Sequence, residues 1–323
     1  MLSQIARFEF RYQFRNPVFW VAAAMFFLFA FGSMASDQIQ IGGGGNVHAN
    51  APVAIIQTHL VMAILFMFAL AAMVANVVVR DDETRFGPLI RTTRVTKPAY
   101  LFGRFAGAFG AAALCYASIP LALWLGSLMP WLDPETLGPN RLATFLFAYT
   151  LMGLPVLLVT GAVLFAVATA TRSMMATYLA VIVFLASYAA MTALIGSVPS
   201  LRPYAPYLEP FGIAAFALET RYWTVADSNA MLPSLAGPIG WSRLLWIGIA
   251  IALLGIAQWR YRFADRGISR RAARREAQRA RVEAWAPPPP AAAGTLPPPR
   301  TRGAWSAQLV ARTRMEVRHV VRS

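Results

Sequence analysis

Long apolar stretches separated by short polar segments are the main pattern along this chain. A membrane-spanning helix needs about 20 mainly apolar residues. Six stretches meet this requirement, at 18–34, 53–79, 105–129, 142–170, 174–198 and 243–259. The first is too long for a cleaved signal peptide, and further apolar stretches follow it. The pattern therefore predicts an all-α, polytopic membrane protein with six transmembrane helices.

The composition also indicates a membrane protein. Apolar residues make up 58% of the 323 positions and charged residues only 13%, whereas soluble proteins carry about 25% charged residues. The single cysteine, Cys115, cannot form an intrachain disulfide. These values argue against an ordinary soluble enzyme, a disulfide-rich secreted protein and a disordered chain.

Basic residues predict the orientation of the spans. With the N-terminus inside, the inner segments hold 25 Lys and Arg and the outer segments hold 4. Such an excess is the positive-inside pattern, so we expect both termini to be cytoplasmic. Residues 260–323 hold 15 basic and 4 acidic residues, and therefore +11 of the overall +15 charge. We interpret this charge as a topology signal and expect no nucleic-acid partner, because the basic tail directly follows a span and lipid headgroups are its nearest partner.

Both ends of the chain contain the same charged motif. Segment 1–17 is predicted to be a cytoplasmic interfacial helix that includes Arg7, Glu9, Arg11 and Arg15. Its three arginines share one helical face toward lipid phosphates, and its aromatic residues lie in the lipid boundary. A simple positive-inside anchor is the alternative. The pattern R-x-E-x-R-x-x-x-R recurs from Arg314, 307 residues after Arg7. We interpret segment 304–323 as the start of a second six-helix unit, and the chain as the first half of a duplicated transporter; a chance match is the alternative.

The remaining organisation follows from composition. We expect a six-helix domain at 18–259, a basic cytoplasmic helix at 260–285 and a stiff Pro-rich linker at 286–303. Three glycines, Gly103, Gly107 and Gly110, predict a close helix contact near the start of the third span. Pro120 and Pro155 can kink their helices.

Two loops are candidates for function. The inner loop 80–104 mixes charges of both signs, which suits docking to another protein, although a solvated connector is the alternative. The outer segment 199–243 is rich in aromatic residues, Pro and Gly. We expect it to form short interfacial or re-entrant helices, acting either as a structural lid or as a gate that uses Glu209, Glu219 or Arg221.

Motifs for enzyme chemistry are missing from the sequence. No charged residue lies in the middle of a predicted span, which argues against an ion-coupled pump. The glycines at 42–45 are not followed by Lys and Ser or Thr, so they do not form a P-loop, and no H-E-x-x-H zinc motif or G-x-S-x-G elbow occurs. We therefore expect a protein without its own enzymatic activity, metal or cofactor.

Four motifs carry a resemblance to a known family. They are Phe8-Glu9-Phe10-Arg11 with Asn16-Pro17, the loop at 92–103, the segment Glu209-Pro210-Phe211-Gly212, and the segment Thr220-Arg221-Tyr222-Trp223-Thr224. Together with the six spans they resemble a type-two ABC exporter permease, and in particular the N-terminal permease repeat of bacterial permeases fused to a gluzincin aminopeptidase. Because the chain ends before any peptidase domain, we assign it no peptidase activity.

The resemblance implies a partner and a location. It implies a multi-pass protein of the bacterial inner membrane that pairs with a separate ABC ATPase and a second permease half. The loop after the second span would dock on the ATPase, through residues Asp82, Glu83, Arg85, Gly87, Leu89, Arg94 and Lys97. The outer motif would contribute Glu209, Pro210, Phe211, Gly212, Arg221 and Trp223. The alternative function is a membrane anchor that tethers a downstream domain without transporting anything.

Overall fold

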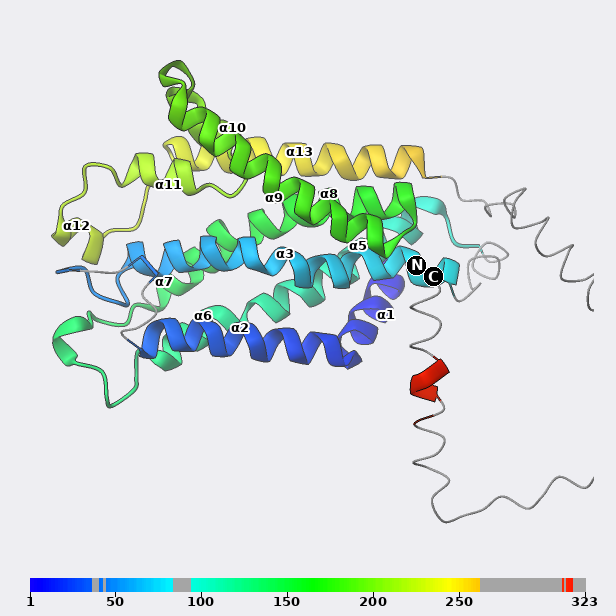
Figure 1. Cartoon of the computed structure of the whole chain (residues 1–323), viewed down its shortest axis with the longest axis horizontal. Helices are drawn as coiled ribbons and strands as arrows, with labels where there is room; N and C mark the ends of the chain where they lie inside the picture. Colours follow the sequence, from blue (N-terminus) through cyan, green and yellow to red (C-terminus); the bar gives the residue numbers. More distant parts are fainter. Residues whose placement is uncertain (37–40, 43–44, 84–93, 262–309, 311, 316–323) are drawn as a thin grey trace, which may run out of the picture. The chain divides into compact units, whose positions relative to one another are not determined.

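The computed structural model describes residues 1–36, 41–42, 45–83, 94–261, 310 and 312–315 (Figure 1). The chain divides into two units, 1–265 and 266–323. The predicted tail helix at 260–285 and the Pro-rich linker fall almost wholly outside the described residues. In the second unit, residues 310 and 312–315 are helical. The following description concerns the first unit, whose described residues form helices and no strand.

Six helical segments in the described part are long and apolar enough to span a membrane, which confirms this prediction from the sequence. The first two are α2 (Pro17–Ala35) and α3 (Pro52–Glu83). The third combines α5 (Lys97–Tyr116) with α6 (Ser118–Gly126). The fourth combines α7 (Leu142–Phe147), the π-helix η2 (Ala148–Gly153) and α8 (Leu154–Thr171). The last two are α9 (Met174–Ser197) and α13 (Pro238–Arg260).

Two helix starts differ from the sequence prediction. The third span begins at Lys97 rather than at 105, and the sixth begins at Pro238 rather than at 243. In both helices a proline stands in the first turn, where its fixed φ favours helix initiation. Polar residues of these extra turns, such as Arg104 and Ser242, are buried. A search for apolar stretches therefore places the start of each helix too late.

Backbone breaks lie beside the two prolines singled out in the sequence. The π-helical segment η2 ends two residues before Pro155, and α5 passes into α6 at Ala117, three residues before Pro120. A proline cannot donate a backbone hydrogen bond and its ring clashes with the carbonyl four residues earlier. The wider π-turn accommodates that missing bond, because π-bulges arise where the regular ladder is interrupted.

The helices are arranged as a bundle (Figure 1). Helix α3 is central, since most of its side chains are buried, whereas α9 has almost no buried residues. Helix α1 (Leu2–Arg15) packs at one end of the bundle, against α5. At the opposite end lie the short helices η1 (Pro134–Thr136), η3 (Pro199–Tyr204), α10 (Ala205–Leu208), α11 (Ile213–Glu219) and α12 (Val225–Ala230).

Candidate functional site

The contact between α1 and α5 is unusually close because two glycines of α5 face α1. A Cβ atom built on Gly103 would lie 2.9 Å from Cβ of Ile5. A Cβ atom on Gly107 would overlap the carbonyl oxygen of Ala6 and lie 2.7 Å from Cβ of Glu9. The close helix approach predicted from these glycines therefore occurs, and the partner is the N-terminal helix rather than another span.

A network of four charged side chains fills this contact. The Glu9 carboxylate is fully buried and its Oε2 accepts hydrogen bonds from Arg80 Nη2 at 2.8 Å and from Arg104 Nη1. The other terminal nitrogen of Arg104 donates to Asp81 Oδ2 at 2.5 Å. Tyr100 donates its hydroxyl to the same Asp81 oxygen at 2.6 Å. The network joins α1 to the end of α3 and to the start of α5.

Gln13 completes the attachment of α1. Its side-chain amide donates to Glu9 Oε1 and to the backbone carbonyl of Met73, each at 3.0 Å. Both oxygens of Glu9 are therefore satisfied, and two carboxylates face two guanidinium groups. Pairing and hydrogen bonding of this kind offset the cost of burying these charges. The arrangement fixes the rotation of α1 about its own axis.

The sequence placed Glu9 on an interfacial helix surface and did not group it with Arg80, Asp81, Tyr100 or Arg104. The structure buries Glu9 in the bundle, so it does not share the exposed face of the arginines. The signal that could have indicated it is the spacing of Glu9 and Gln13, which fall on one helical face next to the small residue Ala6. By contrast, Arg7, Arg11 and Arg15 are exposed, as expected.

The predicted docking loop is only partly within the described residues. Asp82 and Glu83 extend α3, while Arg85, Gly87 and Leu89 lie outside the described residues. Arg94 is exposed, and Lys97 donates from Nζ to the carbonyl of Trp259 at 3.2 Å, near the C-terminus of α13. A cation at that position interacts favourably with the helix dipole. The two ends of the loop thus emerge directly from the charged network.

The opposite end of the bundle contains a second buried polar cluster. Arg243 of α13 is buried and donates from Nη2 to the carbonyl of Phe211 at 2.7 Å. Gly212 has a φ of 84°, and a Cβ atom there would overlap the same guanidinium, so only glycine fits beneath it. The residues Glu209, Pro210, Phe211 and Gly212 are all buried around this contact.

Glu209 holds the start of α11. Its Oε2 accepts a hydrogen bond from the backbone N–H of Ala214 at 2.8 Å, while its Oε1 is buried with no hydrogen-bond partner among the described residues. Burial raises the pKa of the Glu209 carboxyl above its ordinary value. Two other residues predicted with this motif lie elsewhere: Arg221 is exposed over the ring of Tyr222, and Trp223 is half-buried in the following turn.

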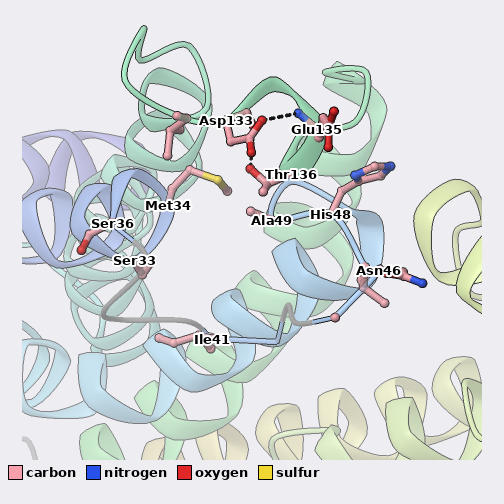
Figure 2. Close-up of a pocket in the computed structure, with 13 residues that line it drawn as sticks. Ser33, Met34, Ser36, Ile41, Asn46, His48, Ala49, Asp133, Glu135 and Thr136 are labelled. Carbon is pink, nitrogen blue, oxygen red and sulfur yellow. Dashed lines mark hydrogen bonds between the residues drawn. The ribbon is translucent and has the colours of Figure 1, made fainter.

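A pocket of about 450 Å³ opens between loops at this same end (Figure 2). Loop residues Asn46, His48, Asp133 and Glu135 line it, and Figure 2 shows Asp133 bonded within its own turn. That bond runs from the Glu135 N–H to Asp133 Oδ1 at 3.0 Å. The described residues contain no group of three or more His, Cys, Asp or Glu side chains suited to a metal ion. The pocket is therefore lined by polar loop residues that form no such group among those described.

The geometry favours a mechanical role for the charged network over a chemical one. Both Glu9 oxygens accept hydrogen bonds, from Gln13 and from the two arginines. What the network does provide is a rigid joint between three helices. A comparison of the sequence with models of known protein families and with characterised proteins finds no match.

Proposed function

We propose that the chain is a transmembrane permease subunit, or half of one, of an ATP-driven ABC exporter in a bacterial inner membrane. A separate ATPase would bind the loop between α3 and α5, and a second permease half would complete the translocation path. The observation that carries the proposal is the buried network of Glu9, Arg80, Asp81 and Arg104 at the base of that loop. It supports a route by which a force on the loop reaches three helices together.

The physical argument starts from rigidity. Breaking a buried ion pair by removing one partner costs about 3–5 kcal/mol, so α1, α3 and α5 move as one body when the loop is displaced. The chain carries no P-loop, and the energy would come from ATP hydrolysed on the partner. The resemblance of the sequence motifs to type-two exporter permeases supports the same function. The anchor alternative gives no reason for tying the N-terminal helix to both ends of one loop.

The test reverses the charges of the loop. A variant carrying Asp82→Lys, Glu83→Lys and Arg85→Glu should lose co-purification of a P-loop ATPase with the tagged full chain from native membranes. The matched control is Asp133→Lys, Glu135→Lys and Arg141→Glu, three exposed residues at the opposite end of the bundle. It should retain the ATPase. Equal ATPase recovery with both variants would refute docking at this loop, and no ATPase with the unmodified chain would refute the proposed function and favour the anchor.

A further inference from the structure

The outward face of α1 forms an open basic groove. Its volume is about 750 Å³, and it is lined by residues that include Arg7, Phe8, Arg11, Tyr12 and Arg15. The three arginines are spaced four residues apart, so their guanidinium groups form one row along the helix. Among the described residues, no carboxylate lies within ion-pair distance of any of the three.

Within α1 itself, no carboxylate on the outward face balances these three arginines. Glu9, the only acidic residue of α1, is turned into the bundle and neutralised by Arg80 and Arg104. Two aromatic rings separate the network from the groove: the Arg80 guanidinium lies 3.8 Å from the centroid of Tyr12, and that of Arg104 lies 5.6 Å from the centroid of Phe8. The groove therefore presents three positive charges beside exposed aromatic surface.

The position of the groove in the fold indicates the level of the membrane surface. It ends at Asn16 and Pro17, where the first span begins, and Asn16 caps that span by accepting from the N–H of Val18 at 3.0 Å. The corner is held by Trp20, which donates to the carbonyl of Phe14 at 3.0 Å and is itself exposed. Exposed Trp at the end of a span is typical of the membrane–water interface.

We propose that this groove binds the headgroups of anionic phospholipids in the leaflet where α2 begins. Guanidinium groups recognise phosphate oxygens through two parallel hydrogen bonds, and the exposed rings of Phe8 and Tyr12 match the adjoining apolar boundary. A lipid fits better than a soluble protein because the groove is continuous with the lipid-exposed side of α2, which carries Val21, Met25 and Leu28. This inference requires a membrane-spanning chain but does not depend on the proposed transport function.

The experiment titrates the purified full chain in neutral detergent with phosphatidylglycerol and with phosphatidylcholine of the same acyl chains, and it counts bound lipids by native mass spectrometry. The variant Arg7→Gln, Arg11→Gln, Arg15→Gln should bind phosphatidylglycerol about 100-fold more weakly, since each arginine near an anionic surface contributes about a fivefold effect. The matched control, Arg141→Gln, Arg202→Gln, Arg221→Gln, removes the same charge from exposed positions at the opposite end of the bundle and should bind as the unmodified chain does.

Two further variants guard against a folding defect. The lysine variant Arg7→Lys, Arg11→Lys, Arg15→Lys keeps the charge and should retain preference for phosphatidylglycerol, while Arg11→Gln alone should weaken binding about fivefold. The proposal would be overturned if the control at the opposite end loses as much phosphatidylglycerol binding as the α1 glutamine variant. It would also be overturned if the lysine variant loses as much as the glutamine variant. Displacement of the lipid by millimolar inorganic phosphate would also overturn it, as would lost ATPase binding in the α1 variant with lipid binding unchanged.

Discussion

Two glycines of α5 offer a direct test of the contact between α1 and α5. Gly107 and Gly110 lie one helical turn apart, and both face α1. A Cβ atom on Gly110 would meet the ring of Phe10 at 3.5 Å, which is an ordinary contact. A Cβ atom on Gly107 would overlap the carbonyl oxygen of Ala6, a backbone atom that cannot move unless α1 moves. Substitution by alanine should therefore have different effects at the two positions.

The magnitude follows from opposing contributions to the free energy of unfolding. Replacing glycine by alanine within a helix is favourable by about 1 kcal/mol at either position. Forcing an extra methyl group into a filled contact costs about 1–3 kcal/mol. Because the helix propensity contribution is common to both variants, Gly107→Ala should be less stable than Gly110→Ala by about 1–3 kcal/mol. Displacement of α1 would also stretch the bonds from Arg104 to Glu9, which adds to the same loss.

The assay compares the unfolding of the two purified variants in one detergent, by denaturant titration followed through tryptophan fluorescence. The unmodified chain is the reference, and far-ultraviolet circular dichroism verifies that each variant is folded at the start. If Gly107→Ala and Gly110→Ala unfold within about 0.5 kcal/mol of each other, α1 does not lie against α5 as described, and the reasoning about the buried network fails with it.

Two other substitutions test the buried carboxylates. Glu9→Gln leaves Arg80 and Arg104 facing a neutral group, so the free energy of unfolding should fall by about 3–5 kcal/mol; a loss below 1 kcal/mol in the same titration would contradict a buried network. Glu209→Gln keeps an acceptor for the N–H of Ala214 while removing a carboxyl whose pKa is raised by burial. A raised pKa in the folded state means that ionisation costs stability as pH rises above the ordinary value near 4.5, and the full cost applies above the folded pKa. The midpoint temperature of thermal unfolding should therefore fall less between pH 4.5 and pH 8 in Glu209→Gln than in the unmodified chain. If the midpoint depends on pH in the same way for both proteins, Glu209 is not buried as a carboxyl.

The spans could be predicted from the sequence because apolar length alone determines them. A stretch of about 20 apolar residues is stable as a helix across the bilayer. Only its ends are hard to predict, where polar residues belong to the same helix. The starts of α5 and α13 were missed for this reason. In α5, Tyr100 and Arg104 count against a span in any hydropathy window, yet both are buried. In α13, the missed turn 238–242 includes the buried polar residue Ser242.

The polar contacts could not be predicted, because they join distant parts of the chain. Glu9 meets Arg104 across 95 residues and Arg243 meets Phe211 across 32. The spacing of residues along one helix predicts that a charged residue faces solvent. It cannot identify a residue of opposite charge on another helix that would offset the cost of burial. The sequence did single out the Glu209-Pro210-Phe211-Gly212 motif, but the reason for Gly212 became evident only with Arg243 above it.

The positions of the charges restrict how the two ends of the bundle can communicate. In the described spans, Arg80 and Asp81 end α3, Arg104 lies near the start of α5, and Arg243 lies near the start of α13. No described charge lies midway, so a signal would travel by movement of whole helices rather than by a relay of ionic contacts. Helices α3 and α5 are fastened at both ends, since Tyr116 donates to the carbonyl of His59 at 2.6 Å at the end away from α1. We infer that this pair tilts as a unit when the loop is displaced. If the proposed ATPase binds this loop, Gly107→Ala and Glu9→Gln, which loosen one end, should reduce stimulation of its ATP hydrolysis more than its binding. An equal loss of both would locate the role of α1 in docking instead.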